Sequence, residues 1–269
     1  MSKRQNKKET QAYWVGALIL LMVITACSYF VYLMVTDKSV EVDKNTGCPV
    51  NPDVIAGHTI FLIDTTDKLS TQEQSAVEVD IKNRILELPE YHRVSLFVLS
   101  ENINKSIESL INICSPRKFD AKRDDEFSTG KQYLDKQFEQ KFKAPILEVT
   151  KKLTDGTPGN ASPIFEVIKM VKTNGFDRFS NGKQKVLNLV IYSDLLHHTN
   201  EFTLYQSNPS YANLINSNYG MKALPKLQGI EVSINYFIHE PAFQKGPFVD
   251  FWRELIKDRG GKIVELKSV

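Results

Sequence analysis

Short apolar runs alternate with amphipathic stretches over most of the chain. One run covers residues 60–63 and another covers most of residues 186–192, and both end at hydroxyl and carboxylate side chains. Runs of this length are typical of central strands that are buried on both faces of a sheet. Between the runs, apolar side chains recur at helical spacing, as in residues 77–88. This alternation predicts an α/β domain with a doubly wound, mostly parallel sheet and helices on both of its faces.

Capping and breaking residues set the limits of the expected elements. Ser70 and Glu73 form the capping box of a helix that Pro89 stops, and Ser162 followed by Pro163 has the pattern of a helix N-cap. The predicted strands are residues 59–64, 93–100, 107–113, 186–193, 231–238 and 262–266. The predicted helices are residues 70–88, 131–153 with a bend at Pro145, 162–172, 211–224 and 248–259.

The N-terminal part of the chain differs in composition from the rest. Residues 1–11 are polar and basic, whereas residues 12–36 form an uncharged run. At 1.5 Å per residue, this run is long enough to cross the ~30 Å core of a bilayer. The positive-inside rule then predicts a cytoplasmic tail (1–11), a transmembrane helix (12–36), a linker (37–56) and an extracytoplasmic domain (57–269). The alternative is a cleaved signal peptide with a lipid on Cys27, because residues 24–27 resemble a lipoprotein cleavage box.

Charge and cysteine content narrow the function and the compartment. The formal net charge is +2, from 34 basic and 32 acidic side chains, and no basic stripe is present, which argues against nucleic-acid binding. If the domain lies outside the cytoplasm, Cys48 and Cys114 are chemically free to form a disulfide. It would join the entry of the domain to the segment after the strand predicted at residues 107–113. The other interpretation is a pair of free thiols.

Three loops carry the candidate chemistry. They are residues 64–68 (Asp-Thr-Thr-Asp-Lys), residues 159–164 (Gly-Asn-Ala-Ser-Pro-Ile) and residues 193–194 (Ser-Asp). In an open α/β sheet, ligands bind beyond the carboxyl ends of the strands, where these acidic and hydroxyl side chains fall. The order of the loops and their apolar flanks resemble the von Willebrand factor A-like family and its metal-ion-dependent adhesion site. The resemblance covers about residues 57–269 and implies the same α/β fold for them.

The resemblance also implies a metal site. In the family, the first loop reads Asp-x-Ser-x-Ser, the second supplies a Thr before a helix, and the third supplies an Asp. Matched position by position, the ligands in this chain are Asp64, Thr66, Ser162 and Asp194. Hydroxyl and carboxylate oxygens from separate loops, completed by waters, suit an octahedral Mg²⁺ or Mn²⁺. The remaining corner of the octahedron would bind the carboxylate of a partner.

Two positions depart from the family pattern. Leu195 stands where Gly is common, and Lys68 stands where a second Ser is a direct ligand. The corner therefore has two interpretations. In the first, a divalent metal binds, and Asp67 or Ser70 replaces the lost ligand, although Ser70 already caps a helix. In the second, the ammonium of Lys68 replaces the ion by pairing with the carboxylates of the site, which is then metal-free.

An enzyme is the rival class of function. Haloacid-dehalogenase-like phosphatases also end a first strand in Asp-x-Asp, but Thr66 stands in place of the second Asp, which is their general acid. No Asp-Asp pair follows the later strand. The adjacent His197 and His198 point in different directions, so we expect them to be solvated or packed against loops. The aromatic side chains of residues 202–219 are expected either to form a partner surface at the rim of the site or to cover the core.

Together these features predict a non-catalytic protein-interaction module. We expect it to be anchored in a bacterial inner membrane through residues 12–36, with the C-terminal domain in the periplasm or outside the cell. Its partners would be other proteins at the membrane, within a multi-subunit complex, bound through Mg²⁺ or Mn²⁺ to a partner carboxylate. The alternatives are a metal-free structural subunit of a membrane complex and a haloacid-dehalogenase-like phosphatase.

Overall fold

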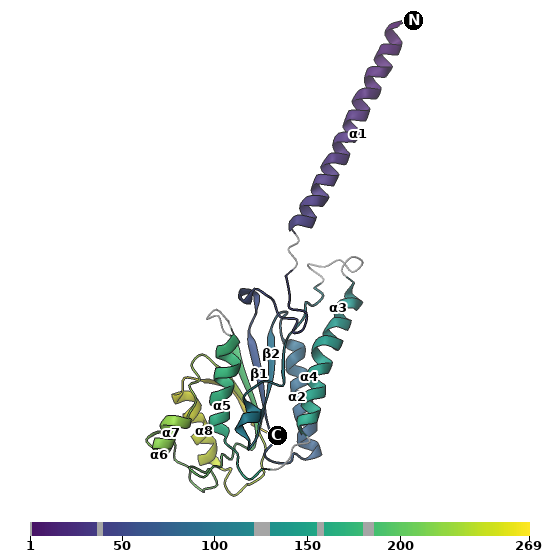
Figure 1. Cartoon of the computed structure of the whole chain (residues 1–269). Helices are drawn as coiled ribbons and strands as arrows, with labels where there is room; N and C mark the ends of the chain where they lie inside the picture. The colour runs from purple at the N-terminus through teal and green to yellow at the C-terminus, as the bar shows by residue number, and fades with distance from the viewer. Residues whose placement is uncertain (1, 37–39, 121–129, 155–158, 180–185) are drawn as a thin grey trace. The chain divides into compact units, whose positions relative to one another are not determined.

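The computed structural model describes residues 2–36, 40–120, 130–154, 159–179 and 186–269. Within the first helix, it describes the side chains of residues 14 and 16–32. The chain divides into two compact units, Met1–Glu41 and Val42–Val269. In the first unit, helix α1 (Ser2–Thr36) runs without a break through the tail and the anchor that the sequence predicts (Figure 1). Among the described residues, no helix has the length and apolar character needed to cross a membrane. The limits of the four segments predicted from the sequence remain predictions.

The second unit is built on a six-stranded sheet in the order β3-β2-β1-β4-β5-β6. Neighbouring strands are parallel except β2 and β3, which pair antiparallel. The strands are β1 (His58–Asp64), β2 (Arg93–Leu99), β3 (Ile111–Cys114), β4 (Leu187–Ser193), β5 (Glu231–Tyr236) and β6 (Lys262–Ser268). This order confirms the doubly wound, mostly parallel sheet. Strand β3 begins at Ile111 rather than at residue 107, because the chain bends over residues 107–110 after a 3₁₀ helix, η2 (Ile103–Ser106).

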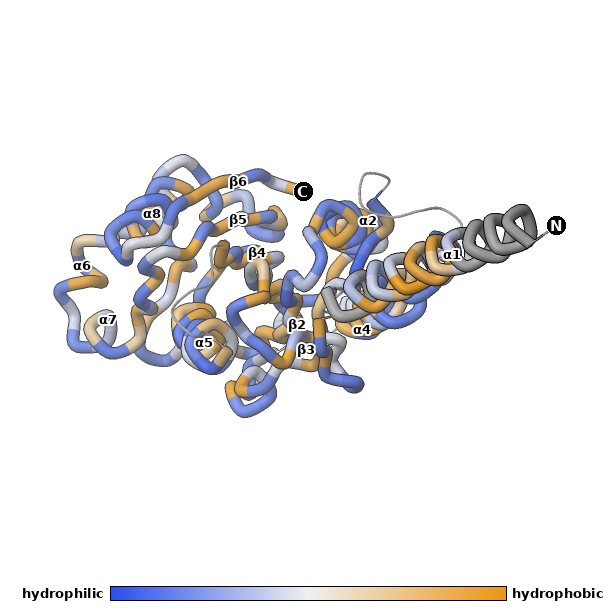
Figure 2. Tube along the Cα trace, turned by 90° about the horizontal axis from the view of Figure 1, so that it is seen from above, coloured by the Kyte–Doolittle hydropathy of each residue, from blue (hydrophilic) through white to orange (hydrophobic). Residues whose placement is uncertain are grey.

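Helices cover both faces of the sheet (Figure 1). One face carries α2 (Thr71–Glu87), α3 (Lys131–Phe138) and α4 (Ala144–Thr154). The other face carries α5 (Ile164–Val171), α6 (Tyr211–Ile215), α7 (Asn218–Ala223) and α8 (Gly246–Asp258). The side chains of β1 therefore alternate between two apolar clusters: Ile60 and Leu62 pack with α5 and α8, whereas Phe61 packs with α2 and α4. The apolar character of the central strands is visible in Figure 2.

Two of the predicted helices are interrupted. The helix predicted at 131–153 consists of α3, a π-helical segment η3 (Glu139–Lys143) and α4. A widened turn before Pro145 relieves the clash of its ring with the preceding turn. The helix predicted at 211–224 is divided into α6 and α7. The break occurs because the hydroxyl of Ser217 accepts the N–H of Gly220 and so begins a new helix.

A disulfide between Cys48 and Cys114 confirms the predicted pairing, with the two Cα atoms 4.7 Å apart. It fastens the segment that enters the domain to the end of the edge strand β3. The N–H of Cys114 also donates to the carbonyl of Thr46 at 2.9 Å, so the same junction has a backbone hydrogen bond. Cys27, in α1, is an exposed free cysteine.

Candidate metal-binding site

Strands β1 and β4 lie side by side where the order of the sheet reverses, and ligands bind in the crevice beyond such a switch point. Strand β1 ends at Asp64, and β4 ends at Ser193, which Asp194 follows. The parallel register, in which Ile63 pairs with Tyr192, brings the two ends together. Ser193 Oγ consequently donates a hydrogen bond of 2.6 Å to Asp64 Oδ2.

Asp64 is buried and held in one orientation. Its Oδ1 accepts hydrogen bonds from the N–H (2.9 Å) and the hydroxyl (2.7 Å) of Thr66. Burial raises the pKa of Asp64, although the hydrogen bonds from Ser193 and Thr66 oppose the rise. A carboxylate has about four acceptor positions, so three donors leave Asp64 able to make one further contact.

The second loop is tied to the other two by backbone hydrogen bonds. The N–H of Gly159 donates to the carbonyl of Thr66 (2.8 Å), and Ser162 and His198 exchange backbone bonds of 2.8 and 2.9 Å. These bonds leave Ser162 Oγ 3.2 Å from Thr66 Oγ1. The prediction that Ser162 caps helix α5 is therefore wrong: Pro163 occupies the N-cap without a side-chain bond, and the Ser162 hydroxyl faces the first loop instead.

Asp194 is a buried carboxyl group whose pKa is strongly raised. Its side chain is 2% exposed, and Oδ1 accepts the N–H of Leu196 at 2.9 Å. The Asp194 carboxyl group also has a side-chain hydrogen bond with Asp67. Burial, followed by the negative charge of Asp64, raises the pKa of Asp194 to about 8. At neutral pH this group therefore holds a proton unless a cation takes the place of that proton.

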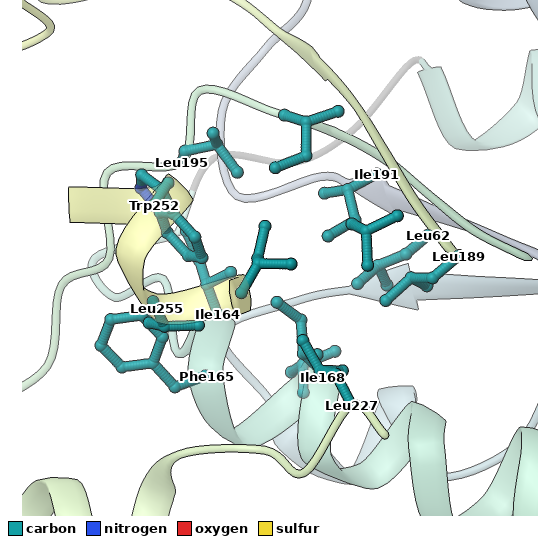
Figure 3. Close-up of a cluster of buried hydrophobic side chains, with 14 of the residues drawn as sticks. Leu62, Ile164, Phe165, Ile168, Leu189, Ile191, Leu195, Leu227, Trp252 and Leu255 are labelled. Carbon is teal, nitrogen blue, oxygen red and sulfur yellow. The ribbon is translucent and has the colours of Figure 1, made fainter. Parts of the chain in front are cut away.

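The turn after Asp194 has a left-handed backbone. Leu195 has a φ of 62°, a region that glycine adopts with little strain and a leucine does not. This conformation explains why the resembling family often has Gly here. The Leu195 side chain compensates by packing in the core cluster that contains Ile164 and Trp252 (Figure 3). Its N–H donates to Ser193 Oγ at 2.8 Å, which fixes the turn against β4.

His239 lies beside the site, although it belongs to none of the three predicted loops. It follows β5, whose end is in register with the end of β4, since Ser193 pairs with Tyr236. His239 Nδ1 is 3.9 Å from Asp194 Oδ2. One ligand atom from each of Asp67, Asp194 and His239 lies within 4.8 Å of the other two.

The other ring nitrogen of His239 is hydrogen-bonded to a carboxylate. His239 Nε2 is 3.0 Å from Glu73 Oε1, and Glu73 Oε2 accepts the N–H of Ser70 at 2.7 Å. Glu73 is thus the second member of the capping box that the sequence predicts, and the Ser70 hydroxyl accepts its N–H in return. Burial raises the pKa of Glu73, but the bonds from Ser70 and the nearby His239 lower it overall.

A small polar pocket adjoins these groups. Its volume is about 40 Å³, which is room for about three waters at ~10–15 Å³ each. It is lined by Thr66, Asp67, Gly159, Asn160, Ala161, Ser162, His198 and Tyr205. Carboxylate and hydroxyl oxygens beside the buried carboxyl group of Asp194 are a ligand set that hard divalent cations prefer. The residues therefore fit a divalent metal, and the assignment of Asp64, Thr66, Ser162 and Asp194 as ligands stays a prediction.

The three residues predicted as substitute ligands or modulators of the site lie in different places. Lys68 is exposed and forms no ion pair with Asp64 or Asp194, although the structure describes all three side chains. Ser70 is exposed and engaged in its helix cap. Asp67 lines the pocket and also belongs to the group with Asp194. Of the three, only Asp67 therefore lies at the candidate site.

The paired histidines and nearby aromatic side chains mostly cover the core. His197 is buried, its ring stacks on Phe165 with centroids 4.1 Å apart, and its Nε2 lies 2.8 Å from Tyr219 Oη. Burial lowers the pKa of His197 to about 3. His198 is exposed, and its Nδ1 pairs with Thr203 Oγ1 at 3.1 Å. His197 is thus packed and His198 is exposed, as expected for this pair.

Sequence reasoning did not assign Ser193, His239 or the contact of Glu73 with the site. One signal for His239 was available, because a titratable residue shortly after β5 lies near residues that follow the parallel neighbour β4. Ser193 stood in the third loop but was given no role. The contact of Glu73 with His239 joins positions 166 residues apart, so no local pattern could reveal it.

Comparisons with known proteins give a distant likeness. No family model and no curated protein matches the chain. The structure is similar to that of an aerotolerance-related membrane protein from Bacteroides fragilis carrying multiple mutations to serine. The TM-score is 0.39 and the identity 11%, over 78% of this chain and 92% of that chain. It is also similar to the manganese-loaded TRAP protein of Plasmodium vivax, with a TM-score of 0.35 and 12% identity over 78% and 69% of the two chains.

The fold is assigned from the topology of the chain itself. The sheet is doubly wound and mostly parallel, and its strand order reverses between β1 and β4. Three loops with carboxylate and hydroxyl side chains meet at that point. This is the arrangement that the resemblance implied for the loops at Asp64, Ser162 and Asp194. The second unit therefore has the doubly wound α/β fold that the resemblance to the von Willebrand A-like family implied.

Proposed function

We propose that this chain is a protein-interaction module that binds a divalent cation at the corner formed by its three loops and presents it to a partner carboxylate. The observation that carries the proposal is the buried pair Asp64 and Asp194. Two carboxyl groups are held together at the end of the sheet, and burial, followed by the negative charge of Asp64, raises the pKa of Asp194 to about 8. Burying such groups is costly unless a cation or a proton neutralises them.

The surroundings support binding rather than catalysis. In the rival phosphatase mechanism, a second Asp acts as general acid, whereas here the hydroxyl of Thr66 donates to Asp64. A threonine hydroxyl does not supply a proton at neutral pH as a carboxyl group would. The adjoining pocket, of about 40 Å³, holds about three waters, which suits a cation with its waters or one partner carboxylate.

The proposed location is the outer side of a bacterial inner membrane. The uncharged run of residues 12–36 after the basic residues 1–11 supports an anchor with a cytoplasmic N-terminus. The disulfide between Cys48 and Cys114 supports an oxidising compartment for the domain, because disulfides rarely persist in the cytosol. The partners would then be other membrane proteins in one complex.

The test is recovery of partners on the tagged full-length chain from detergent-solubilised membranes of its own source. We expect one set of proteins to be retained with Mg²⁺ or Mn²⁺, and to be lost with EDTA or with Asp64→Asn. The control is Asp250→Asn, because Asp250 is an exposed carboxylate of α8 outside the site. Retention that is equal with EDTA and with Asp64→Asn would favour the alternative of a metal-free structural subunit.

A further inference from the structure

The two ring nitrogens of His239 have the surroundings that are usual for a metal-binding histidine, with one nitrogen at a carboxylate and the other at the site. Its Nε2 faces the carboxylate of Glu73 at 3.0 Å, and its Nδ1 faces Asp194 Oδ2 at 3.9 Å. Because Glu73 Oε2 already accepts the N–H of Ser70, the carboxylate is fixed at the first turn of α2. A ligating histidine usually donates its other N–H to such a carboxylate, which sets its tautomer and its orientation.

The carboxylate of Glu73 favours the tautomer of His239 that carries its proton on Nε2, and this tautomer has a free lone pair on Nδ1. This lone pair then faces Asp194 Oδ2, an oxygen of a buried carboxyl group that also has a side-chain hydrogen bond with Asp67. The separation of 3.9 Å is too long for a hydrogen bond between the two atoms. It does fit two ligands of one ion, because two metal bonds of ~2.0–2.2 Å span at most about 4.4 Å.

We propose that His239 is a ligand of the metal at this site and that the site therefore prefers a transition-metal ion such as Zn²⁺ to Mg²⁺. The inference rests on the proposed function, since it adds a ligand to the same corner. His239 would supply a nitrogen where Lys68 has replaced an expected hydroxyl ligand, beside the oxygens of Asp67 and Asp194. Imidazole suits zinc, copper, iron and nickel, whereas Mg²⁺ is bound through oxygen.

The small number of histidines makes the proposal testable. The chain has five histidines, and His58, His92 and His197 are buried. His198 is exposed and lines the pocket beside the site, and its Nδ1 is hydrogen-bonded to Thr203 Oγ1. It is therefore a matched control: a histidine at the rim of the site that the proposal does not assign to the metal.

The experiment is calorimetric titration of the metal-stripped full-length chain, in detergent, with Zn²⁺, Co²⁺ and Mg²⁺ separately. We expect His239→Ala to weaken Zn²⁺ and Co²⁺ at least tenfold and to change Mg²⁺ affinity less than twofold. His198→Ala should weaken the binding of all three ions far less than His239→Ala weakens Zn²⁺ and Co²⁺, because the proposal gives His198 no bond to the metal. The visible absorption of the Co²⁺ form should also shift in His239→Ala, because a nitrogen ligand is lost.

The orienting role of Glu73 has its own control. Glu73→Gln should weaken Zn²⁺ binding by about tenfold, a usual cost of losing the carboxylate that holds a ligating histidine. Ser70→Ala weakens the same helix cap but leaves the bond between Glu73 and His239, so it should not change the affinity. If Ser70→Ala weakens Zn²⁺ as much as Glu73→Gln, the effect comes from the helix cap and the orienting role is wrong.

The outcomes separate this inference from the proposed function. If Mg²⁺ and Zn²⁺ both bind and His239→Ala changes neither, the metal site stands and His239 is not a ligand. If no divalent ion binds the wild-type chain, the metal-dependent function and this inference both fail. A loss of Zn²⁺ affinity of equal size in His198→Ala and His239→Ala would also contradict the assignment.

Discussion

Leu195 combines a strained backbone with a buried side chain. Its φ of 62° costs about 1–2 kcal/mol for a residue with a Cβ atom, whereas its side chain is 1% exposed in the core. The same turn directs the N–H of Leu196 to Asp194, so the strain lies within the candidate metal site. The side chain of Leu195 thus stabilises a turn that its own backbone disfavours.

Substitution at this position should reverse the usual order of alanine and glycine. Both Leu195→Ala and Leu195→Gly lose buried contacts, at a cost of about 2–5 kcal/mol for the alanine. Glycine also relieves the backbone strain, so we expect Leu195→Gly to be more stable than Leu195→Ala by about 1 kcal/mol. Urea unfolding of the full-length chain, followed by tryptophan fluorescence, measures the difference.

Leu196 provides the control for this reversal. It is equally buried, at 1% exposure, and is not among the residues with positive φ. There the glycine variant should be the less stable of the two, by about 0.5–1 kcal/mol. If alanine is the more stable replacement at both positions, the left-handed turn does not strain Leu195.

At the scale of elements, local signals were sufficient for β1 and α2. The apolar run of residues 60–63 and the capping box of Ser70 and Glu73 predicted both elements to within a residue or so. The break between α6 and α7 was missed because Ser217, a helix N-cap, lies within a stretch that otherwise has helical character. The Ser162 hydroxyl faces Thr66, a contact between residues 96 positions apart, and local capping rules cannot anticipate it.

The disulfide is the element-scale feature with the clearest energetic consequence. It closes a loop with a sequence separation of 66 residues, for which the chain-entropy estimate is about 4 kcal/mol of stabilisation. We expect reduction, or the double variant Cys48→Ala and Cys114→Ala, to lower the free energy of unfolding by about 2–4 kcal/mol. The control is Cys27→Ser, which should leave the urea midpoint unchanged, because Cys27 is free and exposed. A reduced protein with the midpoint of the oxidised form would contradict the role of the disulfide.

At the scale of the whole molecule, stability should depend on pH in two opposite ways. Burial lowers the pKa of His92 to about 4 and of His197 to about 3, and it lowers the pKa of His58 well below its ordinary value. The unfolded chain binds these protons near pH 6.5 and the folded chain does not, so stability falls as the pH drops from about 6.5 to about 4. Asp194 keeps a proton up to about pH 8 in the folded state, so stability also falls as the pH rises toward 8.

The metal-free protein should therefore be most stable near pH 6.5. Below that pH, the three histidines outweigh the buried carboxyl groups of Asp64 and Asp194, and above it only the contribution of these carboxyl groups remains. Asp194→Asn should remove most of the fall between pH 6.5 and 8 without changing the fall in acid. Urea midpoints from pH 4 to 9, measured in EDTA, show both slopes. A wild-type protein whose stability does not fall between pH 6.5 and 8 would show that Asp194 is not a strained, protonated group.

The most direct test of the central claim is thermal unfolding of the full-length chain in detergent, first in EDTA and then with increasing Mg²⁺, Mn²⁺ or Zn²⁺. Wild type should be stabilised by about 2.7 kcal/mol, or about 5–10 °C, at a hundredfold excess over Kd. Asp64→Asn should not respond, and Lys68→Ser should respond at least as strongly as wild type. If only Lys68→Ser responds to metal, the lysine prevents binding and the metal-bridging account of this protein is wrong.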